Sequence, residues 1–140
     1  MKISTRGRYG LRAMIDLAIN EDGEAIPLRV IAERENISEQ YLEQLFANLR
    51  KSGLVKSVRG AHGGYLLNRS PEKITAGDVF RVLEGPVSPV DCVQDGYDCE
   101  KSEECVTHDL WNILSDQIEE VLDSFTLEDF KNKAKKIKAN

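Results

Sequence analysis

Three patterns in direct succession place the strongest constraint on the fold of this chain. A short stretch with apolar residues at helical spacing follows Pro27. A second such stretch covers 39–51 and is preceded by Ser38, a residue suited to an N-cap. Two alternating runs, 54–58 and 65–67, then flank a glycine-rich segment and predict a β-hairpin. Two helices joined by a tight turn and followed by a hairpin are typical of a winged helix-turn-helix. We therefore expect a mainly α-helical fold with a small β-hairpin.

Four further helices are predicted from apolar residues at helical spacing. They cover about 5–19, with Thr5 as the N-cap, 75–85, 106–124 and 126–137. The helix over 106–124 carries a continuous apolar stripe. The stripe consists of Leu110, Trp111, Leu114, Ile118, Val121 and Leu122. Such a long C-terminal stripe suits a dimerisation helix, and packing against its own domain is the alternative.

The net charge of −5 is unusual for a nucleic-acid binder, but the charge is unevenly divided along the chain. Residues 1–90 carry 13 basic and 11 acidic residues, whereas residues 91–140 carry 6 basic and 13 acidic residues. The stretch 48–69 holds five basic residues and no acidic one. Such a patch can neutralise phosphates whatever the overall charge. The alternative is an ordinary solvated basic stretch.

Residues at the start of the second helix of a helix-turn-helix face base edges in the major groove. Gln44 has the chemistry to pair with adenine, and Glu43 can accept a hydrogen bond from cytosine. Arg59 at the hairpin tip is placed to enter a minor groove, and the first helix supplies candidates for phosphate contacts. The candidate DNA-binding residues are Thr5, Arg6, Arg8, Ser38, Glu39, Gln40, Tyr41, Glu43, Gln44, Arg50, Arg59, Gly60 and His62. Taken singly, most of them also fit plain exposed polar positions.

These patterns divide the chain into three parts. We expect a winged helix-turn-helix DNA-binding domain over 1–85, a loop without periodicity over 86–105, and a dimerisation helix with a C-terminal tail over 106–140. No apolar run is long enough to cross a bilayer and no signal peptide is recognisable, so we expect a cytoplasmic protein that does not contact membranes. The sequence contains no nucleophile–base pair and no phosphate-binding loop, so we do not expect an enzyme.

The three cysteines fall within the aperiodic segment and precede a histidine. Cys92, Cys99, Cys105 and His108 follow the spacing C-x6-C-x5-C-x2-H. An odd number of cysteines excludes a closed disulfide framework within one chain, and a reducing cytosol disfavours disulfides. Three thiolates and an imidazole suit tetrahedral zinc or an iron–sulfur cluster with mixed ligands. Unrelated free thiols remain the alternative.

Several motifs in the right order resemble the Rrf-type transcription regulators, from Met1 to about Phe130. The matching segments are Lys2-Ile3-Ser4, Arg8-Tyr9-Gly10, Tyr41-Leu42-Glu43-Gln44-Leu45, Leu49-Arg50-Lys51-Ser52-Gly53-Leu54-Val55 and Val58-Arg59-Gly60-Ala61-His62-Gly63-Gly64-Tyr65-Leu66-Leu67. The resemblance implies a homodimer, built on the long C-terminal helix, that binds a partly palindromic double-stranded DNA operator.

The same resemblance extends to the cysteines. The iron–sulfur cluster regulators of this family carry three cysteines in this loop and a histidine three residues after the last one, the place held here by His108. This similarity implies a [2Fe–2S] cluster bound by Cys92, Cys99, Cys105 and His108, with 86–105 as the cluster-binding loop. One departure is that six residues separate the first two cysteines here, and the family pattern has five.

The function implied is a transcription regulator whose operator binding is controlled by the cluster, and whose targets are genes for iron–sulfur cluster assembly. A nitric-oxide or redox sensor with a [4Fe–4S] cluster is one alternative. A DNA-binding protein stabilised by zinc is another. The segment 84–90 resembles the cysteine-metabolism repressors of the family, which makes a regulator of cysteine metabolism a third alternative.

Overall fold

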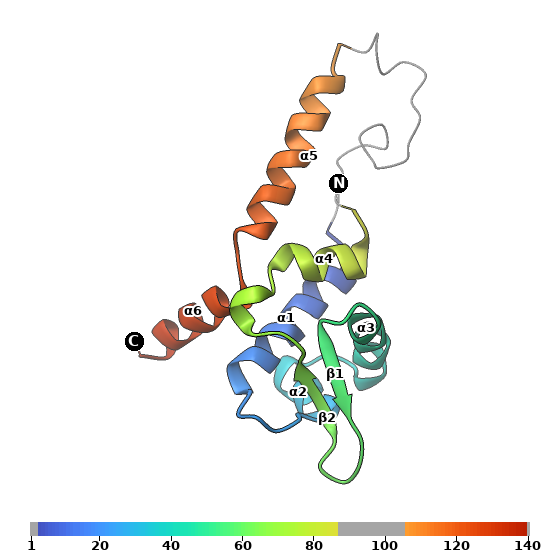
Figure 1. Ribbon diagram of the computed structural model, residues 1–140, viewed down its shortest axis with the longest axis vertical. Coiled ribbons are helices and arrows are strands. Elements are labelled where there is room, and N and C mark those ends of the chain that lie inside the picture. Colours follow the sequence, from blue (N-terminus) through green and yellow to red (C-terminus); the bar gives the residue numbers. More distant parts are fainter. Residues whose placement is uncertain (1–2, 87–105, 140) are drawn as a thin grey trace.

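The computed structural model of the protein (Figure 1) describes residues 3–86 and 106–139. Its helices and strands are α1 (Thr5–Asn20), α2 (Leu28–Glu35), α3 (Glu39–Lys51), β1 (Val55–Val58), β2 (Gly64–Leu67), η1 (Pro71–Lys73), α4 (Ala76–Glu84), α5 (His108–Asp123) and α6 (Leu127–Ala139). The mainly α-helical winged helix-turn-helix fold with a small β-hairpin is confirmed.

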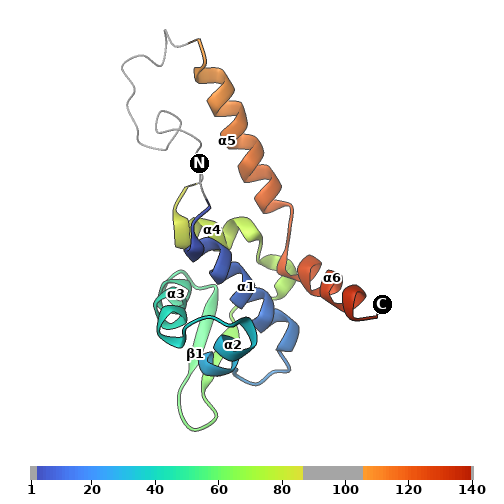
Figure 2. The same ribbon diagram turned by 180° about the vertical axis from the view of Figure 1, so that it is seen from behind.

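Helix α1 crosses the middle of the molecule (Figure 2) and contacts α2, α3, α4 and α6. Met14 and Leu17 of α1 are fully buried and meet Phe46 of α3 and Ile31 of α2 in one core cluster. Complete burial of a side chain of this size stabilises the fold by about 1.5–3 kcal/mol. Leu127 of α6 is also fully buried, so the C-terminal helix contributes to the same core.

The turn between α2 and α3 has the conformation that a helix-turn-helix requires. Asn36 ends α2 in the left-handed region with φ 53°, which a short polar side chain tolerates. Ile37 is buried and its amide donates to the carbonyl of Ala32 at 3.0 Å. The Ser38 hydroxyl then accepts from the amide of Tyr41, which caps α3 as predicted.

Helix α3 ends in a Schellman motif that leads directly into the wing. Gly53 has φ +85°, and the amide of Leu54 donates to the carbonyl of Leu49 at 3.1 Å. The antiparallel strands β1 and β2 pair with Val55 opposite Leu67 and Val58 opposite Gly64. The predicted strands, 54–58 and 65–67, therefore agree with β1 and β2 to within one residue at each end.

Three local features differ from the sequence-based expectations. Thr5 is not the N-cap of α1, because Ser4 is extended and its hydroxyl accepts from the amide of Arg6 at 3.2 Å. Ile26 and Tyr65 exchange two backbone hydrogen bonds of 3.0 and 2.9 Å, which ties the segment before α2 to β2. A short 3-10 helix, Pro71–Lys73, precedes α4, and α5 begins at His108.

Helix α5 extends away from α1–α4 (Figures 1 and 2), and none of its residues is buried. Four apolar side chains on this helix are exposed. They are Leu110, Ile113, Leu114 and Val121, with exposed fractions of 54, 60, 39 and 55%. Across residues 3–86 and 106–139, no helix combines the length and apolarity that spanning a bilayer requires.

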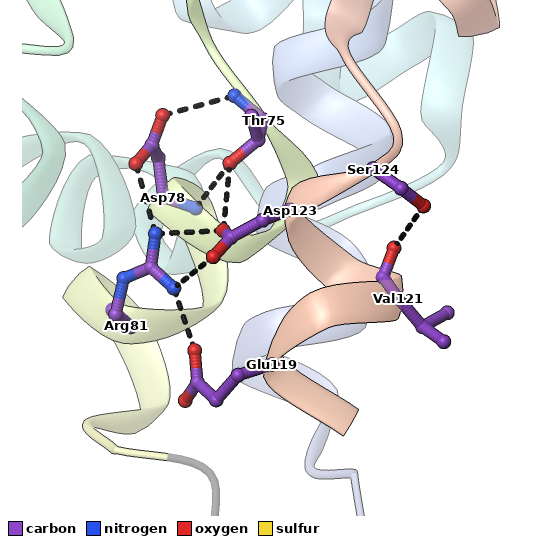
Figure 3. A network of polar contacts seen from close by, with 7 residues as sticks. All are labelled: Thr75, Asp78, Arg81, Glu119, Val121, Asp123 and Ser124. Atoms are coloured by element: carbon purple, nitrogen blue, oxygen red, sulfur yellow. Dashed lines mark hydrogen bonds and ion pairs between the residues drawn. The ribbon is translucent and has the colours of Figure 1, made fainter. Parts of the chain in front are cut away.

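A polar network, which we call the Arg81 network, joins α4 to the end of α5 (Figure 3). Arg81 donates to Glu119 at 2.6 Å, to Asp123 at 2.8 and 3.2 Å, and to Asp78 at 3.1 Å. Thr75 and Asp78 form a capping box at the start of α4, and the Thr75 hydroxyl also donates to Asp123. The network thus fixes the C-terminal end of α5 on the first turns of α4.

Backbone pairing strengthens the same junction. The amide of Ala76 donates to the carbonyl of Phe125 at 2.8 Å, and the amide of Leu127 donates to the carbonyl of Ile74 at 2.9 Å. Hydrogen bonds from the Arg81 guanidinium hold the pKa of Asp123 below its usual value. The same contacts raise the pKa of Arg81 above its usual value, so the ion pair is fully charged at neutral pH.

We expect Asp123→Asn to lower the free energy of unfolding by less than about 1 kcal/mol at neutral pH, because both side chains are more than a third exposed. Folding lowers the pKa of Asp123. Its carboxylate therefore contributes to the free energy of unfolding at pH values above the pKa that Asp123 has in the unfolded chain. The contribution is lost as the pH falls through the folded pKa. Urea unfolding followed by the fluorescence of Trp111, the single tryptophan, measures the difference at each pH.

Asp116→Asn is the matched control, because Asp116 is exposed on the same helix and outside the Arg81 network. A carboxyl NMR titration gives a second readout. The pKa of Asp123 is expected to rise when Arg81 is replaced by Gln, and an unmoved pKa would contradict the electrostatic account.

Candidate nucleic-acid interface

Helix α3 has one face in the core and one face free for a ligand. Leu42, Leu45, Phe46 and Leu49 are buried, and their apolar packing orients the helix. The opposite face exposes the side chains predicted to read bases. These are Glu39, Gln40, Glu43 and Gln44. Arg50 is exposed in the last turn. The helix therefore presents two amides and two carboxylates that are able to discriminate between bases.

The first turn of α1 lies against the first turn of α3. The hydroxyl groups of Thr5 and Tyr41 are 3.2 Å apart, within hydrogen-bonding distance. The rings of Tyr9 and Tyr41 meet edge to face with centroids 6.1 Å apart, and the Arg12 guanidinium lies 5.4 Å from the Tyr9 ring centroid. Tyr41 is consequently half-buried. The contact joins α1 to α3, and the exposed part of the Tyr41 side chain remains accessible to a duplex.

This contact brings two sets of predicted residues together. Thr5, Arg6 and Arg8 are exposed on the first turn of α1, and Thr5 contacts Tyr41 in the first turn of α3. Ser38 is exposed as well, although its hydroxyl is engaged as the N-cap. Cations beside a base-reading helix are suited to phosphate contacts that fix its register on a duplex.

The wing presents the third set of predicted residues. Arg59, Gly60 and His62 are exposed in the segment that joins β1 to β2. The segment is closed by a hydrogen bond from the amide of Gly63 to the carbonyl of Gly60 at 3.0 Å. His62 also lines a surface pocket together with Glu24. The tip thus offers a cation on a tight backbone turn.

The arginines divide into paired and unpaired ones. Arg6, Arg8, Arg50 and Arg59 form no ion pair within residues 3–86 and 106–139, whereas Arg12, Arg34 and Arg81 each bind carboxylates. An unpaired guanidinium loses no protein partner when it meets a phosphate. Arg29 and Arg69 form no ion pair within these residues either, so the unpaired set contains all four arginines predicted to bind DNA and two others.

A buried ion pair that the sequence analysis did not predict fixes α2 on α1. Asp16 is 4% exposed and accepts from Arg34 Nη2 at 2.7 Å and from Arg34 Nε at 3.0 Å. Hydrogen bonding to Asp16 raises the pKa of Arg34, and burial beside Asp16 raises the pKa of the neighbouring Glu35. The Arg34 side chain is 38% exposed, so the pair is buried on its Asp16 side only, and removing Arg34 would leave a buried carboxylate without its partner. The apolar spacing of α1 gave no signal for this carboxylate.

Of the four predicted metal ligands, only His108 lies among the described residues. Cys92, Cys99 and Cys105 lie outside them. His108 is the first residue of α5, and its Nδ1 atom is buried with no hydrogen-bond partner. A buried ring nitrogen without a partner costs free energy unless a metal or a donor satisfies it. No group of three or more potential ligands occurs within 3–86 and 106–139.

Comparison with known proteins agrees with this geometry. The Rrf2 family model, described as an iron-dependent transcriptional regulator, matches residues 3–133. The HTH-type transcriptional regulator CymR of Bacillus subtilis (strain 168) is 54% identical over 129 residues, which cover 92% of this chain and 88% of CymR. The solved structure of CymR, the global cysteine regulator of B. subtilis, has a TM-score of 0.77 at 51% identity and covers 95% of this chain and 98% of its own. The structure of T. potens IscR has a TM-score of 0.77 at 48% identity, with coverage of 96% and 88%.

A winged helix-turn-helix with a free recognition face and unpaired arginines defines a DNA-binding transcription regulator. The chain belongs to the Rrf2 family of such regulators. Its named relatives are transcription regulators and not enzymes, in agreement with the sequence-based expectation.

We expect Arg59→Ala to weaken DNA binding uniformly across sequences. The slope of log affinity against log salt concentration is expected to fall in magnitude by about 1, because one phosphate or groove contact is lost. Fluorescence anisotropy on a labelled duplex over a salt series measures the slope. Arg69→Ala is the control, since Arg69 follows β2 at the end of the hairpin remote from the tip. Equal slopes for the two variants would remove Arg59 from the interface.

Proposed function

We propose that this protein is an operator-binding transcription regulator whose DNA binding responds to an iron–sulfur cluster held by Cys92, Cys99, Cys105 and His108. The buried Nδ1 of His108 carries the cluster part of the proposal, because it is a ligand atom without a hydrogen-bond partner among residues 3–86 and 106–139. Genes for iron–sulfur cluster assembly are the proposed targets.

The DNA-binding part is supported by the surface of α1, α3 and the wing. The residues proposed to contact the operator are those predicted from the sequence: Thr5, Arg6, Arg8, Ser38, Glu39, Gln40, Tyr41, Glu43, Gln44, Arg50, Arg59, Gly60 and His62. Arginines on α1 and the wing would neutralise phosphates, and Gln44 and Glu43 would select bases. Glu43 lowers affinity near phosphates, so its proposed contribution is to specificity.

The cluster part is also supported by the donor set. Three thiolates and one imidazole suit a [2Fe–2S] cluster, and also suit zinc or part of a [4Fe–4S] site. When bound, a [2Fe–2S] cluster supplies reversible one-electron chemistry. His108 begins α5, whose other end is fixed to α4 by the Arg81 network. A ligand at the start of α5 would thereby act on a helix that packs against α4, and α4 in turn contacts α1 and α3.

A second candidate function is the regulation of cysteine metabolism. The observation in its favour is the 54% identity to CymR, whose solved structure is described as that of a global cysteine regulator. The segment 84–90 resembles that branch of the family as well. Under this alternative, the thiols would provide the signal and the chain would hold no iron.

We propose that the functional form is a homodimer built on α5. The exposed stripe formed by Leu110, Ile113, Leu114 and Val121 lies on one side of the helix, and no residue of the described chain covers it. Apolar side chains that occupy a continuous helix face are stabilised when a second copy buries them. Two copies would also present two recognition helices to a palindromic operator.

Anaerobic purification followed by visible absorption and by iron, sulfide and zinc analysis tests the cluster. The expected result is a coloured protein with about two irons and two sulfides per chain. His108→Ala is expected to lose most of the iron or to shift the visible bands. His62→Ala is the control, because His62 is exposed on the wing, and its spectrum is expected to match the wild type. A colourless protein with no iron after reconstitution would leave cysteine-linked regulation as the better account.

Ile113→Glu is expected to convert the dimer into a monomer, because a charged side chain would be buried without a partner in the proposed interface. Sedimentation velocity at several protein concentrations measures the change. Asn112→Glu adds the same charge one residue away, on the opposite side of α5, and is expected to remain dimeric. A dimeric Ile113→Glu variant would place the interface elsewhere.

A further inference from the structure

Glu84, the last residue of α4, contacts the first turn of α1 although 77 positions separate it from Gly7. Its Oε1 atom accepts a hydrogen bond from the Ser4 hydroxyl and a second one from the amide of Gly7 at 2.9 Å. Neither DNA contact nor cluster binding accounts for this half-buried carboxylate. The contact between Glu84 and the first turn of α1 therefore needs a separate explanation.

The charge of Glu84 suits the end of the helix that it meets. The amino-terminal end of a helix carries a partial positive charge and amide groups without partners, which a carboxylate stabilises. The first turn of α1 contains no acidic residue and holds Arg6 and Arg8 instead. Glu84 from α4 thus supplies the negative charge that the sequence of α1 lacks.

At two glycines of α1, an added Cβ atom would overlap side chains of α4 as they are placed here. A Cβ atom at Gly7 would lie 2.6 Å from a ring carbon of Phe80 and 2.7 Å from Glu84 Oε1. A Cβ atom at Gly10 would lie 2.1 Å from a methyl carbon of Leu83. The position of α1 along α4 is consequently fixed by packing as well as by hydrogen bonds.

The same turn of α1 contacts the recognition helix. Thr5 lies between Ser4 and the Gly7 amide in the chain, and its hydroxyl is 3.2 Å from the hydroxyl of Tyr41 on α3. Arg6 and Arg8 are exposed on this turn and form no ion pair within the described residues. A change at Glu84 would therefore reach both the proposed phosphate contacts and the first turn of α3.

We propose that Glu84 is a positioning residue for DNA recognition, which holds the first turn of α1 so that Thr5 supports Tyr41 and the arginines of α1 face the duplex. This inference rests on the proposed operator binding and deepens it. Glu84 contacts no DNA in this account and acts through α1. Helix α4 holds Glu84 in place, because the Arg81 network and the capping box fix the part of α4 that precedes Glu84.

The test compares variants by affinity for a duplex that the wild-type protein selects from random-sequence DNA. Glu84→Ala is expected to bind about tenfold more weakly, the effect of losing hydrogen bonds to a charged group. Simple electrostatics predicts the opposite sign, because removing a negative charge favours binding to DNA. Glu84→Gln retains the accepting oxygen and is expected to stay within about twofold of the wild type.

Glu72→Ala is the matched charge control. Glu72 is exposed in η1 and forms no hydrogen bond or ion pair with the rest of the described chain. Its removal is expected to leave binding unchanged or slightly stronger. Ser4→Ala removes one of the two donors and leaves Glu84 in place. Ser4→Ala is expected to weaken DNA binding by a smaller factor than Glu84→Ala, and it takes the place of Glu84→Ala in the test if that variant folds poorly.

A spectroscopic readout separates positioning from general stability. With fluorotyrosine incorporated, the resonance of Tyr41, assigned through Tyr41→Phe, is expected to shift in Glu84→Ala and in Ser4→Ala. It is expected to stay in place in Glu84→Gln and Glu72→Ala. This measurement needs no DNA, so it tests the contact independently of the proposed function.

The outcomes distinguish the two proposals. A wild-type protein that selects no duplex would overturn the proposed operator binding alone. A wild-type protein that binds its duplex, together with a Glu84→Ala variant that binds equally well or more tightly and keeps the Tyr41 resonance, would overturn the role of Glu84 alone. A Glu84→Ala variant that binds the duplex more weakly and shows a shifted Tyr41 resonance supports the positioning role of Glu84.

Discussion

The packing of α1 against α4 brings the two helices so close that a methyl group at Gly7 or Gly10 would overlap Phe80 or Leu83. Most other contacts of the molecule depend on this arrangement. The core cluster forms around the buried face of α1, and α2 is fixed to the same helix by the pair of Asp16 and Arg34. Because α1 is held on several sides, its first turn forms a defined edge beside the recognition helix.

The elements could be predicted from the sequence because their signals are local. Helix α3 shows this best, since Ser38, the apolar residues and Gly53 specify its start, its buried face and its end within sixteen positions. The wing was predictable for the same reason, from alternation and glycines. The choice of Ser4 over Thr5 as the cap of α1 was not predictable, because both residues are good caps, and the contact of the Ser4 hydroxyl with Glu84 joins residues 80 positions apart.

The interactions that position the candidate site were harder to predict, because each joins residues far apart in the chain. Asp16 and Arg34, Ile26 and Tyr65, and Arg81 with Asp123 all meet only after the helices have packed. The exposed residues of α3 and the wing could be predicted, since the apolar pattern fixes which face remains outside. The half-burial of Tyr41 could not, because the contact with Thr5 and Tyr9 depends on where α1 lies.

The segment after α5 returns to the helices from which the chain departed at Glu84. Phe125 and Leu127 pair through their backbones with Ala76 and Ile74, and the Leu127 side chain lies fully buried in the same core cluster as residues of α1. The segment that follows α5 and the DNA-binding domain are therefore not structurally independent modules. Recombination between relatives at the start of α5 would have to preserve this returning segment, so new signals would arise more readily by substitution within the chain than by exchange of whole modules.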